Sequence, residues 1–205
     1  IGYEVAETAD NDFTTVKTGD TGTIGDEAAT AAFTNTRKTG EVTISKTVVS
    51  DKAADKTDVT FTFTIALQNG DQKISGTYSD VTFNENGEGT ITLKHNESKT
   101  IEGLPTGTTY TVTEAAASGF TTEKTGDTGT IRETASTADF TNTRETGDLE
   151  VSKTVESDAA ADKTADFSFT VTLADTTISG TYGGMTFNNG VATFTLKDGE
   201  KKTAE

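Results

Sequence analysis

Two lysines lie within apolar strand patterns, and they are the residues of this chain best placed to do chemistry. Along residues 42–48, alternate side chains point to the same side of a strand, so the apolar ones carry Lys46 into a core with them. Lys153 occupies the same place in residues 149–155. An ammonium alone in a core is costly, and burial favours the neutral amine, which is the nucleophilic form. Both patterns therefore predict an inward-facing amine that requires a partner.

A glutamate and an asparagine also lie on the apolar faces of strands, on two other predicted strands. The alternation of residues 110–114 places Glu114 on the apolar face, and that of residues 138–142 does the same for Asn142. We therefore expect an amine, a carboxyl and a carboxamide to point into one core. A simple ion pair would account for the lysine and the glutamate, but it leaves the asparagine unexplained.

The chain contains a long internal repeat. Residues 17–24 return as residues 124–131, and Lys46 returns as Lys153, in both cases 107 positions later (124 − 17 and 153 − 46). A period of this length is that of a whole small domain.

The chain contains one complete copy of the repeat and two partial copies. Residues 38–145 form one complete copy, residues 1–37 match only its last third, and residues 146–205 match only its first part. These three segments are called the middle, front and back copies below. Because the linkers between them are only a few residues long, we expect the copies to be arranged end to end.

The front and back copies each repeat only some of the three polar residues of the middle copy. Glu7 and Asn35 in the front copy repeat Glu114 and Asn142, whereas the lysine is repeated only in the back copy, as Lys153. The front of one molecule could therefore complete the back of the next, unless a continuing chain supplies the partners in cis.

Composition argues against several classes of function. The formal net charge of −16 at pH 7 disfavours binding to nucleic-acid backbones and to anionic membrane surfaces. With no cysteine and a single histidine, His95, the chain offers no thiolate zinc site, and we expect neither a metal nor a cofactor. No apolar stretch is long enough to cross a bilayer, so no membrane insertion is expected in this segment.

Alternating patterns predict an all-β fold. Asn-Gly pairs at residues 69–70 and 86–87 favour tight hairpins, and long helical patterns are absent. Many short alternating strands predict an antiparallel sandwich or a small barrel. The expected strands of the middle copy are residues 41–48, 59–67, 73–83, 89–95, 109–114 and 136–143.

One segment resembles a known family. Residues 103–114 read Gly-Leu-Pro-Thr-Gly-Thr-Thr-Tyr-Thr-Val-Thr-Glu, which resembles the LPxG…YxVxE segment of the B-type repeat domains of Gram-positive collagen adhesins and of pilin isopeptide-linkage domains. A first-strand lysine and a last-strand asparagine also fall in the family's order, so the resemblance covers the whole middle copy and parts of both flanking copies. It implies tandem immunoglobulin-like antiparallel β-sandwich domains.

The resemblance also implies a covalent crosslink. In that family, a lysine amine attacks an asparagine side-chain amide, ammonia leaves, and an isopeptide bond forms while a glutamate shuttles protons. Carried over to this sequence, Lys46 would bond Asn142 with Glu114 as the shuttle. Each site would react once, so the chain is not expected to be an enzyme.

The flanking copies would react in the same way. Lys153 would bond Asn35 of the next copy with assistance from Glu7, and neighbouring molecules would join head to tail into a filament.

The expected function is mechanical. We expect a structural shaft or stalk segment of a pilus or adhesin on the bacterial cell surface, with neighbouring copies of itself as partners. The alternative is a ligand-binding adhesin domain that recognises a host extracellular protein, for which an inserted loop or an exposed aromatic patch would be required. Host proteins could also be bound through other domains.

Overall fold

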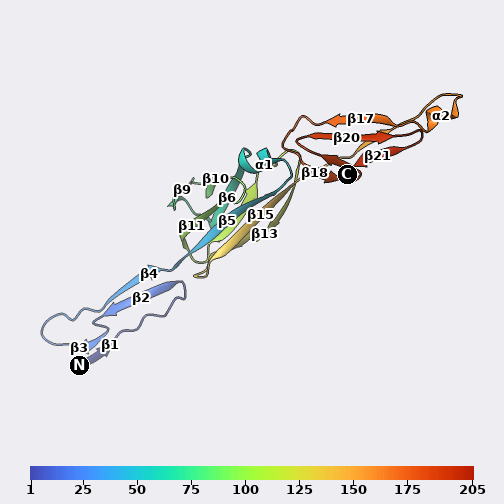
Figure 1. The fold of residues 1–205 in the computed structure, drawn as a ribbon. Helices are drawn as coiled ribbons and strands as arrows, with labels where there is room; N and C mark the ends of the chain where they lie inside the picture. Colours follow the sequence, from blue (N-terminus) through green and yellow to red (C-terminus); the bar gives the residue numbers. More distant parts are fainter. The chain divides into compact units, whose positions relative to one another are not determined.

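The chain is built almost entirely of short β-strands (Figure 1). The computed structural model describes all residues from Ile1 to Glu205. The two helices are single turns, α1 (Ala53–Thr57) and α2 (Ala160–Lys163), and neither has the length required to cross a bilayer. Contacts divide the chain into two compact units. The first comprises Ile1–Lys46, Thr60–Ala116 and Glu123–Phe140, and the second comprises Thr47–Val59, Ala117–Thr122 and Thr141–Glu205.

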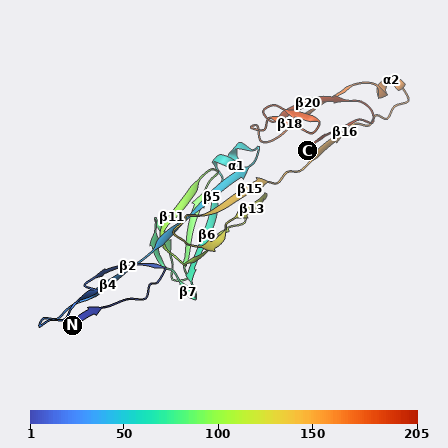
Figure 2. The same cartoon turned by 90° about the horizontal axis from the view of Figure 1, so that it is seen from below.

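The middle copy forms two sheets, whose strands can be followed in Figure 2. One sheet has the order β10-β6-β12-β14, with β7 also paired to β6, and the other has the order β11-β5-β15-β13. A separate ribbon pairs β8 with β9. The strands are β5 (Thr39–Val49), β6 (Phe61–Asn69), β7 (Gln72–Lys73), β8 (Gly76–Tyr78), β9 (Val81–Phe83), β10 (Glu88–Leu93), β11 (Ser98–Pro105), β12 (Thr109–Glu114), β13 (Phe120–Thr125), β14 (Thr128–Thr130) and β15 (Ser136–Arg144).

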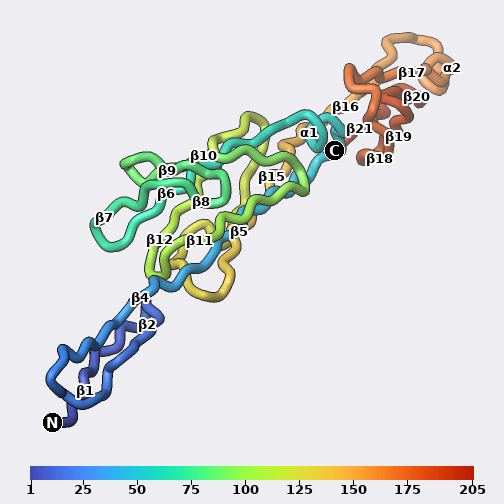
Figure 3. The backbone as a smooth tube through the Cα atoms, turned by 90° about the vertical axis from the view of Figure 1, so that its left-hand side faces the viewer, coloured from blue at the N-terminus to red at the C-terminus, as the bar shows by residue number.

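The front and back copies form two-stranded antiparallel ribbons, which are seen as loops of the backbone in Figure 3. In the front copy β1 pairs with β3 and β2 with β4. In the back copy β16 pairs with β21, β17 with β20 and β18 with β19. The strands are β1 (Gly2–Glu4), β2 (Phe13–Thr18), β3 (Thr21–Thr23), β4 (Ala32–Arg37), β16 (Leu149–Ser152), β17 (Phe167–Thr172), β18 (Gly180–Tyr182), β19 (Met185–Phe187), β20 (Val191–Leu196) and β21 (Lys201–Ala204).

Equivalent segments of the repeat adopt the same local structure. The hydroxyl of Tyr110 donates to the carbonyl of Gly126 at 3.1 Å, and the hydroxyl of Tyr3 donates to the carbonyl of Gly19 at the same distance. A Cβ atom on Gly129 would lie 2.7 Å from the Tyr110 hydroxyl, so the ring can lie there only over a glycine. Sequence identity between the copies therefore translates into the same turns.

Alternation along the strands builds the core of the middle copy. Every second residue of β6 is buried and the threonines between them face solvent. Phe63 of β6 meets Phe140 of β15 edge to face, with ring centroids 5.0 Å apart, so side chains from the two sheets pack against each other. The predicted all-β antiparallel fold is confirmed.

Some details of the predicted strands are wrong. Residues 73–83 do not form one strand, because Ser79 and Asp80 adopt positive φ angles of 45° and 66° and turn the chain between β8 and β9. Strands β11, β13 and β14 and the two helical turns lie outside the predicted segments.

Candidate functional site

Lys46 lies in the core of the middle copy, as its strand phase predicts. It is 1% exposed, and its strand neighbours Val42 and Ile44 are fully buried. The Nζ atom lies 4.3 Å from the centroid of the Phe61 ring, a distance at which an aromatic face attracts a cation. Burial therefore places the amine in apolar surroundings, with an aromatic face on one side.

The backbone of β5 holds Lys46 in place. Its N–H donates to the carbonyl of Glu97 at 3.0 Å, and its carbonyl accepts from the N–H of Asn96 at 2.8 Å. Because these hydrogen bonds fix the backbone of Lys46, the strand determines the direction in which its amine points.

Glu114 is the partner of this amine. Nζ of Lys46 lies 3.2 Å from Oε1 and 3.3 Å from Oε2 of Glu114, whose side chain is only 4% exposed. Glu114 is the last residue of β12, in the sheet opposite β5, so the contact links the two sheets. The structure therefore brings together two of the three side chains that the sequence predicts to meet.

Burial lowers the pKa of the Lys46 amine, and the nearby Glu114 carboxyl partly offsets that effect. A lowered pKa increases the fraction of amine that is neutral and carries a free electron pair. The pair can therefore supply a nucleophile and a proton acceptor at adjacent positions.

Asn142, the third predicted residue, is fully buried on β15. It follows Ala138 and Phe140 in strand phase, and both of these are buried as well. In the sheet order β15 is the hydrogen-bonded neighbour of β5. The inward orientation predicted for Asn142 is confirmed.

The front copy brings its own glutamate and asparagine together. Nδ2 of Asn35 donates to Oε1 of Glu7 at 2.6 Å, and its Oδ1 accepts from the Thr15 hydroxyl at 2.7 Å. Both Glu7 and Asn35 are exposed in the front copy.

Lys153 in the back copy keeps the ring contact of Lys46. Its Nζ lies 4.4 Å from the centroid of the Phe167 ring and donates to the carbonyl of Thr154 at 2.9 Å. Lys153 is only half-buried. The back copy therefore presents the amine without the glutamate and the asparagine.

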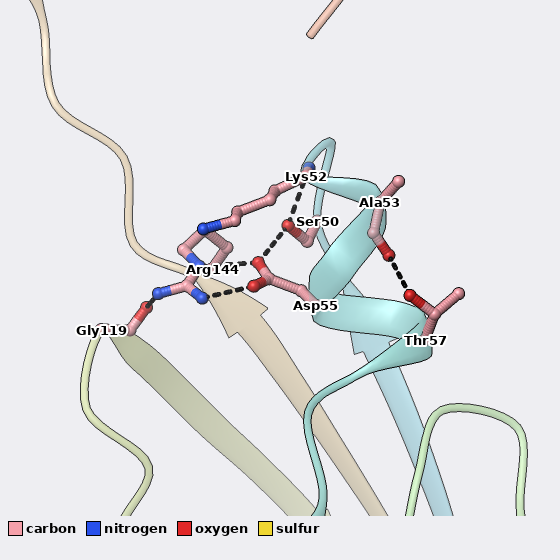
Figure 4. Close-up of polar contacts among 7 residues, drawn as sticks. All are labelled: Ser50, Lys52, Ala53, Asp55, Thr57, Gly119 and Arg144. Carbon is pink, nitrogen blue, oxygen red and sulfur yellow. Dashed lines mark hydrogen bonds and ion pairs between the residues drawn. The ribbon is translucent and has the colours of Figure 1, made fainter. Parts of the chain in front are cut away.

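A second polar cluster, missed by the sequence analysis, joins Asp55 to Arg144 (Figure 4). Arg144 donates from Nε to Oδ2 at 2.8 Å and from Nη2 to Oδ1 at 2.6 Å, while the Ser50 hydroxyl donates to Oδ2 at 2.6 Å. Nη1 of Arg144 donates to the carbonyl of Gly119 at 3.3 Å, and the guanidinium lies 3.9 Å from the Phe120 ring centroid. Asp55 is 1% exposed, so this bidentate pair, called the clamp below, holds a buried carboxylate.

The repeat itself was the signal that could have revealed the clamp. Ser50 and Asp55 recur 107 residues later as Ser157 and Asp162 (157 − 50 and 162 − 55). Polar residues retained at a fixed spacing indicate a shared structural requirement.

We predict that Asp55→Asn destabilises the chain near neutral pH. Hydrogen bonds from Arg144 hold the pKa of Asp55 below its ordinary value, against the opposing effect of burial. The clamp therefore contributes stability above the unfolded-state pKa and loses it as the pH falls through the lowered folded-state pKa. The expected loss is about 1.5–3 kcal/mol in the free energy of unfolding, the range for hydrogen bonds to charged groups.

Urea unfolding at a series of pH values measures this effect. The difference between wild type and Asp55→Asn should shrink in acid, and the exposed Asp58→Asn serves as the control. A difference that stays constant from neutral to acidic pH would show that the charge on Asp55 does not carry the stabilisation.

The structure contains no group of three or more His, Cys, Asp or Glu side chains arranged to hold a metal ion.

Comparisons with known proteins find one matching family model and similar proteins. The model of a family described as "Domain of unknown function (DUF7601)" matches residues 40–144 and 147–205. The pilus tip adhesin Cpa of Streptococcus pyogenes is 44% identical over 87 residues, which are 40% of this chain and 12% of that protein. The chain thus spans about an eighth of the length of this relative.

Solved structures include similar chains. The pilus-presented adhesin Cpa shares 32% sequence identity, with a TM-score of 0.46, over 53% of this chain and 28% of that one. The major pilin of Streptococcus pyogenes shares 18% identity, with a TM-score of 0.45, over 82% of this chain and 78% of that one.

Proposed function

The chain belongs to the DUF7601 family of domains, and we propose that it is a structural shaft or stalk segment of a bacterial surface fibre, stabilised by isopeptide bonds that it forms itself. The observation that carries this proposal is the buried contact between Lys46 and Glu114, on a strand whose neighbour carries the buried Asn142. The identity to a pilus tip adhesin supports a role at the cell surface.

The proposed reaction joins Lys46 to Asn142. The neutral amine attacks the side-chain carbonyl carbon of Asn142, the new Nζ–Cγ bond forms, and the Cγ–Nδ2 bond breaks. Glu114 takes a proton from the attacking amine and passes it to the departing nitrogen, which leaves as ammonia. The reaction needs no cofactor and occurs once per site, so it matures the fold and is not enzymatic turnover.

Such a bond would stabilise a fold with a small core. It would close a loop of 96 residues (142 − 46), and by analogy with a disulfide of that size it would contribute about 4–5 kcal/mol. It would also tie β5 to β15, so that tension entering by one strand leaves by the other while the residues between them stay folded.

The front and back copies would make a second site when they meet. Lys153 of one molecule would bond Asn35 of the next, with Glu7 in the role of Glu114. The two halves would complement each other strand by strand: the order β20-β17-β1-β3 would repeat β10-β6-β12-β14, and the order β21-β16-β4-β2 would repeat β11-β5-β15-β13 of the middle copy.

Burial of the apolar side chains supports this complementation. In the middle copy β12 pairs along β6, and the inward residues of β6 are at most 2% exposed. In the back copy β17 pairs only with β20, and the equivalent residues are half-buried. The residues are Phe61, Phe63, Ile65 and Leu67 in the middle copy and Phe167, Phe169, Val171 and Leu173 in the back copy. An open strand edge beside an apolar face is a binding surface for another strand.

Stretching single molecules from their two ends tests the mechanical role. Because the bond would shield the residues between Lys46 and Asn142 from tension, the wild type should extend less than Glu114→Gln by about 330 Å, the length of roughly 96 extended residues. Equal extension of the two proteins would contradict the proposal.

A further inference from the structure

The two residues proposed to react lie near the ends of their strands. Lys46 is three residues before the end of β5 (49 − 46), and Asn142 is two residues before the end of β15 (144 − 142). Strand ends open more readily than strand centres. An amine attacks a carbonyl carbon only when the reacting atoms are held about 3–3.5 Å apart, so a strand end that opens would separate them. The reaction therefore requires a contact that holds these two ends.

The clamp joins the two strand ends. Ser50 directly follows β5 and Arg144 ends β15, and both donate to the carboxylate of Asp55. Figure 4 shows the three side chains meeting at this carboxylate. Asp55 therefore ties the chain that leaves β5 to the last residue of β15.

Arg144 is also held on its other sides. Its guanidinium lies 3.9 Å from the centroid of the Phe120 ring, and Nη1 donates to the carbonyl of Gly119. A Cβ atom at position 119 would lie 2.6 Å from Nη1, so a side chain there would displace the guanidinium. The backbone N–H of Glu145 donates to the same carbonyl at 2.9 Å. The end of β15 is thus fixed by side chain and backbone, two residues from Asn142.

The parts of the clamp keep a fixed spacing from the reactive residues. In both copies that contain the lysine, a serine follows it by four positions (50 − 46 and 157 − 153) and an aspartate by nine (55 − 46 and 162 − 153). In both copies that contain the asparagine, an arginine follows it by two positions (144 − 142 and 37 − 35). The sequence therefore retains the residues of the clamp together with those of the crosslink.

We propose that Asp55 and Arg144 are positioning residues for the crosslink, and that the clamp holds β5 and β15 in the register that presents Asn142 to the amine of Lys46. The inference rests on the proposed isopeptide bond and adds the contact that aligns its two partners. A shift of β15 by one residue would move Asn142 by about 3.3 Å and turn its side chain to the outer face. Two parallel hydrogen bonds from a planar guanidinium fix both distance and direction, and so oppose such a shift.

The rate of ammonia loss in folded chains tests the positioning role. The full-length chain is made by cell-free synthesis, synthesis is stopped, and samples taken over time are quenched in acid for intact mass. A brief protease pulse gives the folded fraction of each sample, so the rate is expressed per folded chain. Every chain carries Lys153→Ala, which leaves Lys46 as the one amine predicted to react.

Asp55→Asn and Arg144→Gln should each slow ammonia loss per folded chain by at least about tenfold, because a displacement of about 1 Å can cost about a hundredfold. The two substitutions together should be no slower than either alone, since they remove one contact. Arg144→Lys keeps the charge but loses the fork, and should recover part of the rate. This milder variant also serves where the others leave too little folded chain to measure.

Val81→Ala is the control for stability. Val81 is buried on β9 and takes no part in the clamp. The stability losses of Val81→Ala and Arg144→Gln are compared by urea unfolding in chains that also carry Glu114→Gln, in which no bond is expected. Although Val81→Ala destabilises the fold, it should keep the wild-type rate per folded chain.

The side-chain amide signals of Asn142 give a second readout, which a loss of stability alone does not change. In the same Glu114→Gln chains, labelled with ¹⁵N on asparagine, Asn142 should give one sharp pair of signals, assigned by their absence in Asn142→Ala. Arg144→Gln should broaden or multiply this pair, and Val81→Ala should leave it unchanged.

The outcomes separate this inference from the function on which it rests. A wild type that loses no ammonia would overturn the isopeptide bond and the positioning role with it. Clamp variants that react as fast per folded chain as the wild type would overturn the positioning role and leave the bond in place. Unchanged Asn142 signals in Arg144→Gln would overturn the positioning role in the same way.

Discussion

Glu114→Gln should have an intact mass equal to that of its own sequence, because without a carboxyl to move protons the amide at Lys46 cannot form. The wild type should be lighter than its sequence by one ammonia. The variant should also lose the contribution of the crosslink, about 4–5 kcal/mol in the free energy of unfolding. Glutamine keeps the size and polarity of the buried side chain, so packing changes little.

Two measurements check this prediction, namely electrospray mass spectrometry of the intact chain and thermal unfolding. Glu123→Gln on β13 is the matched control, because Glu123 is exposed and should not affect the bond. If Glu114→Gln loses ammonia as completely as the wild type, the role assigned to Glu114 is wrong.

Purified wild-type chain should form covalent ladders that survive boiling in detergent, and Lys153→Ala should abolish them. Lys153 is the amine of the back copy and lies over the Phe167 ring as Lys46 lies over Phe61. Its removal leaves Asn35 of the next molecule with no nucleophile. The variant should still lose one ammonia, because Lys46 and Asn142 are untouched.

Denaturing gels and intact masses of the same samples separate the two sites. Lys197→Ala, on an exposed residue of the back copy, should keep the ladder. A wild type that stays monomeric at high concentration would rule out assembly between neighbouring copies, and a ladder that persists in Lys153→Ala would assign the crosslink to a different residue.

The inward lysine, glutamate and asparagine could be predicted because strand geometry has a period of two. Once the strands at Lys46, Glu114 and Asn142 are identified, their neighbours determine which side each residue faces.

The clamp could not be predicted from the alternation of residues along strands. Asp55 lies in a single helical turn, and Arg144 is the last residue of a strand, where a charged side chain is usually exposed. The contact between them depends on tertiary folding across 89 residues. The sequence analysis also missed the turn at Ser79 and Asp80. A positive φ usually indicates glycine, and neither residue is a glycine.

Several expectations stay predictions. They are the membership of the B-type repeat family, the end-to-end arrangement of the copies, the pairing of Lys153 with Asn35 and any recognition of a host protein.

The most direct test of the proposed crosslink is peptide mapping of the wild-type chain by tandem mass spectrometry. The digest should contain a branched peptide in which Lys46 is joined to Asn142, with a mass lower by one ammonia than the sum of the two separate peptides. Recovery of both peptides in full yield and unlinked, from a chain with the mass of its sequence, would contradict the isopeptide bond and reduce Lys46 and Glu114 to a buried ion pair.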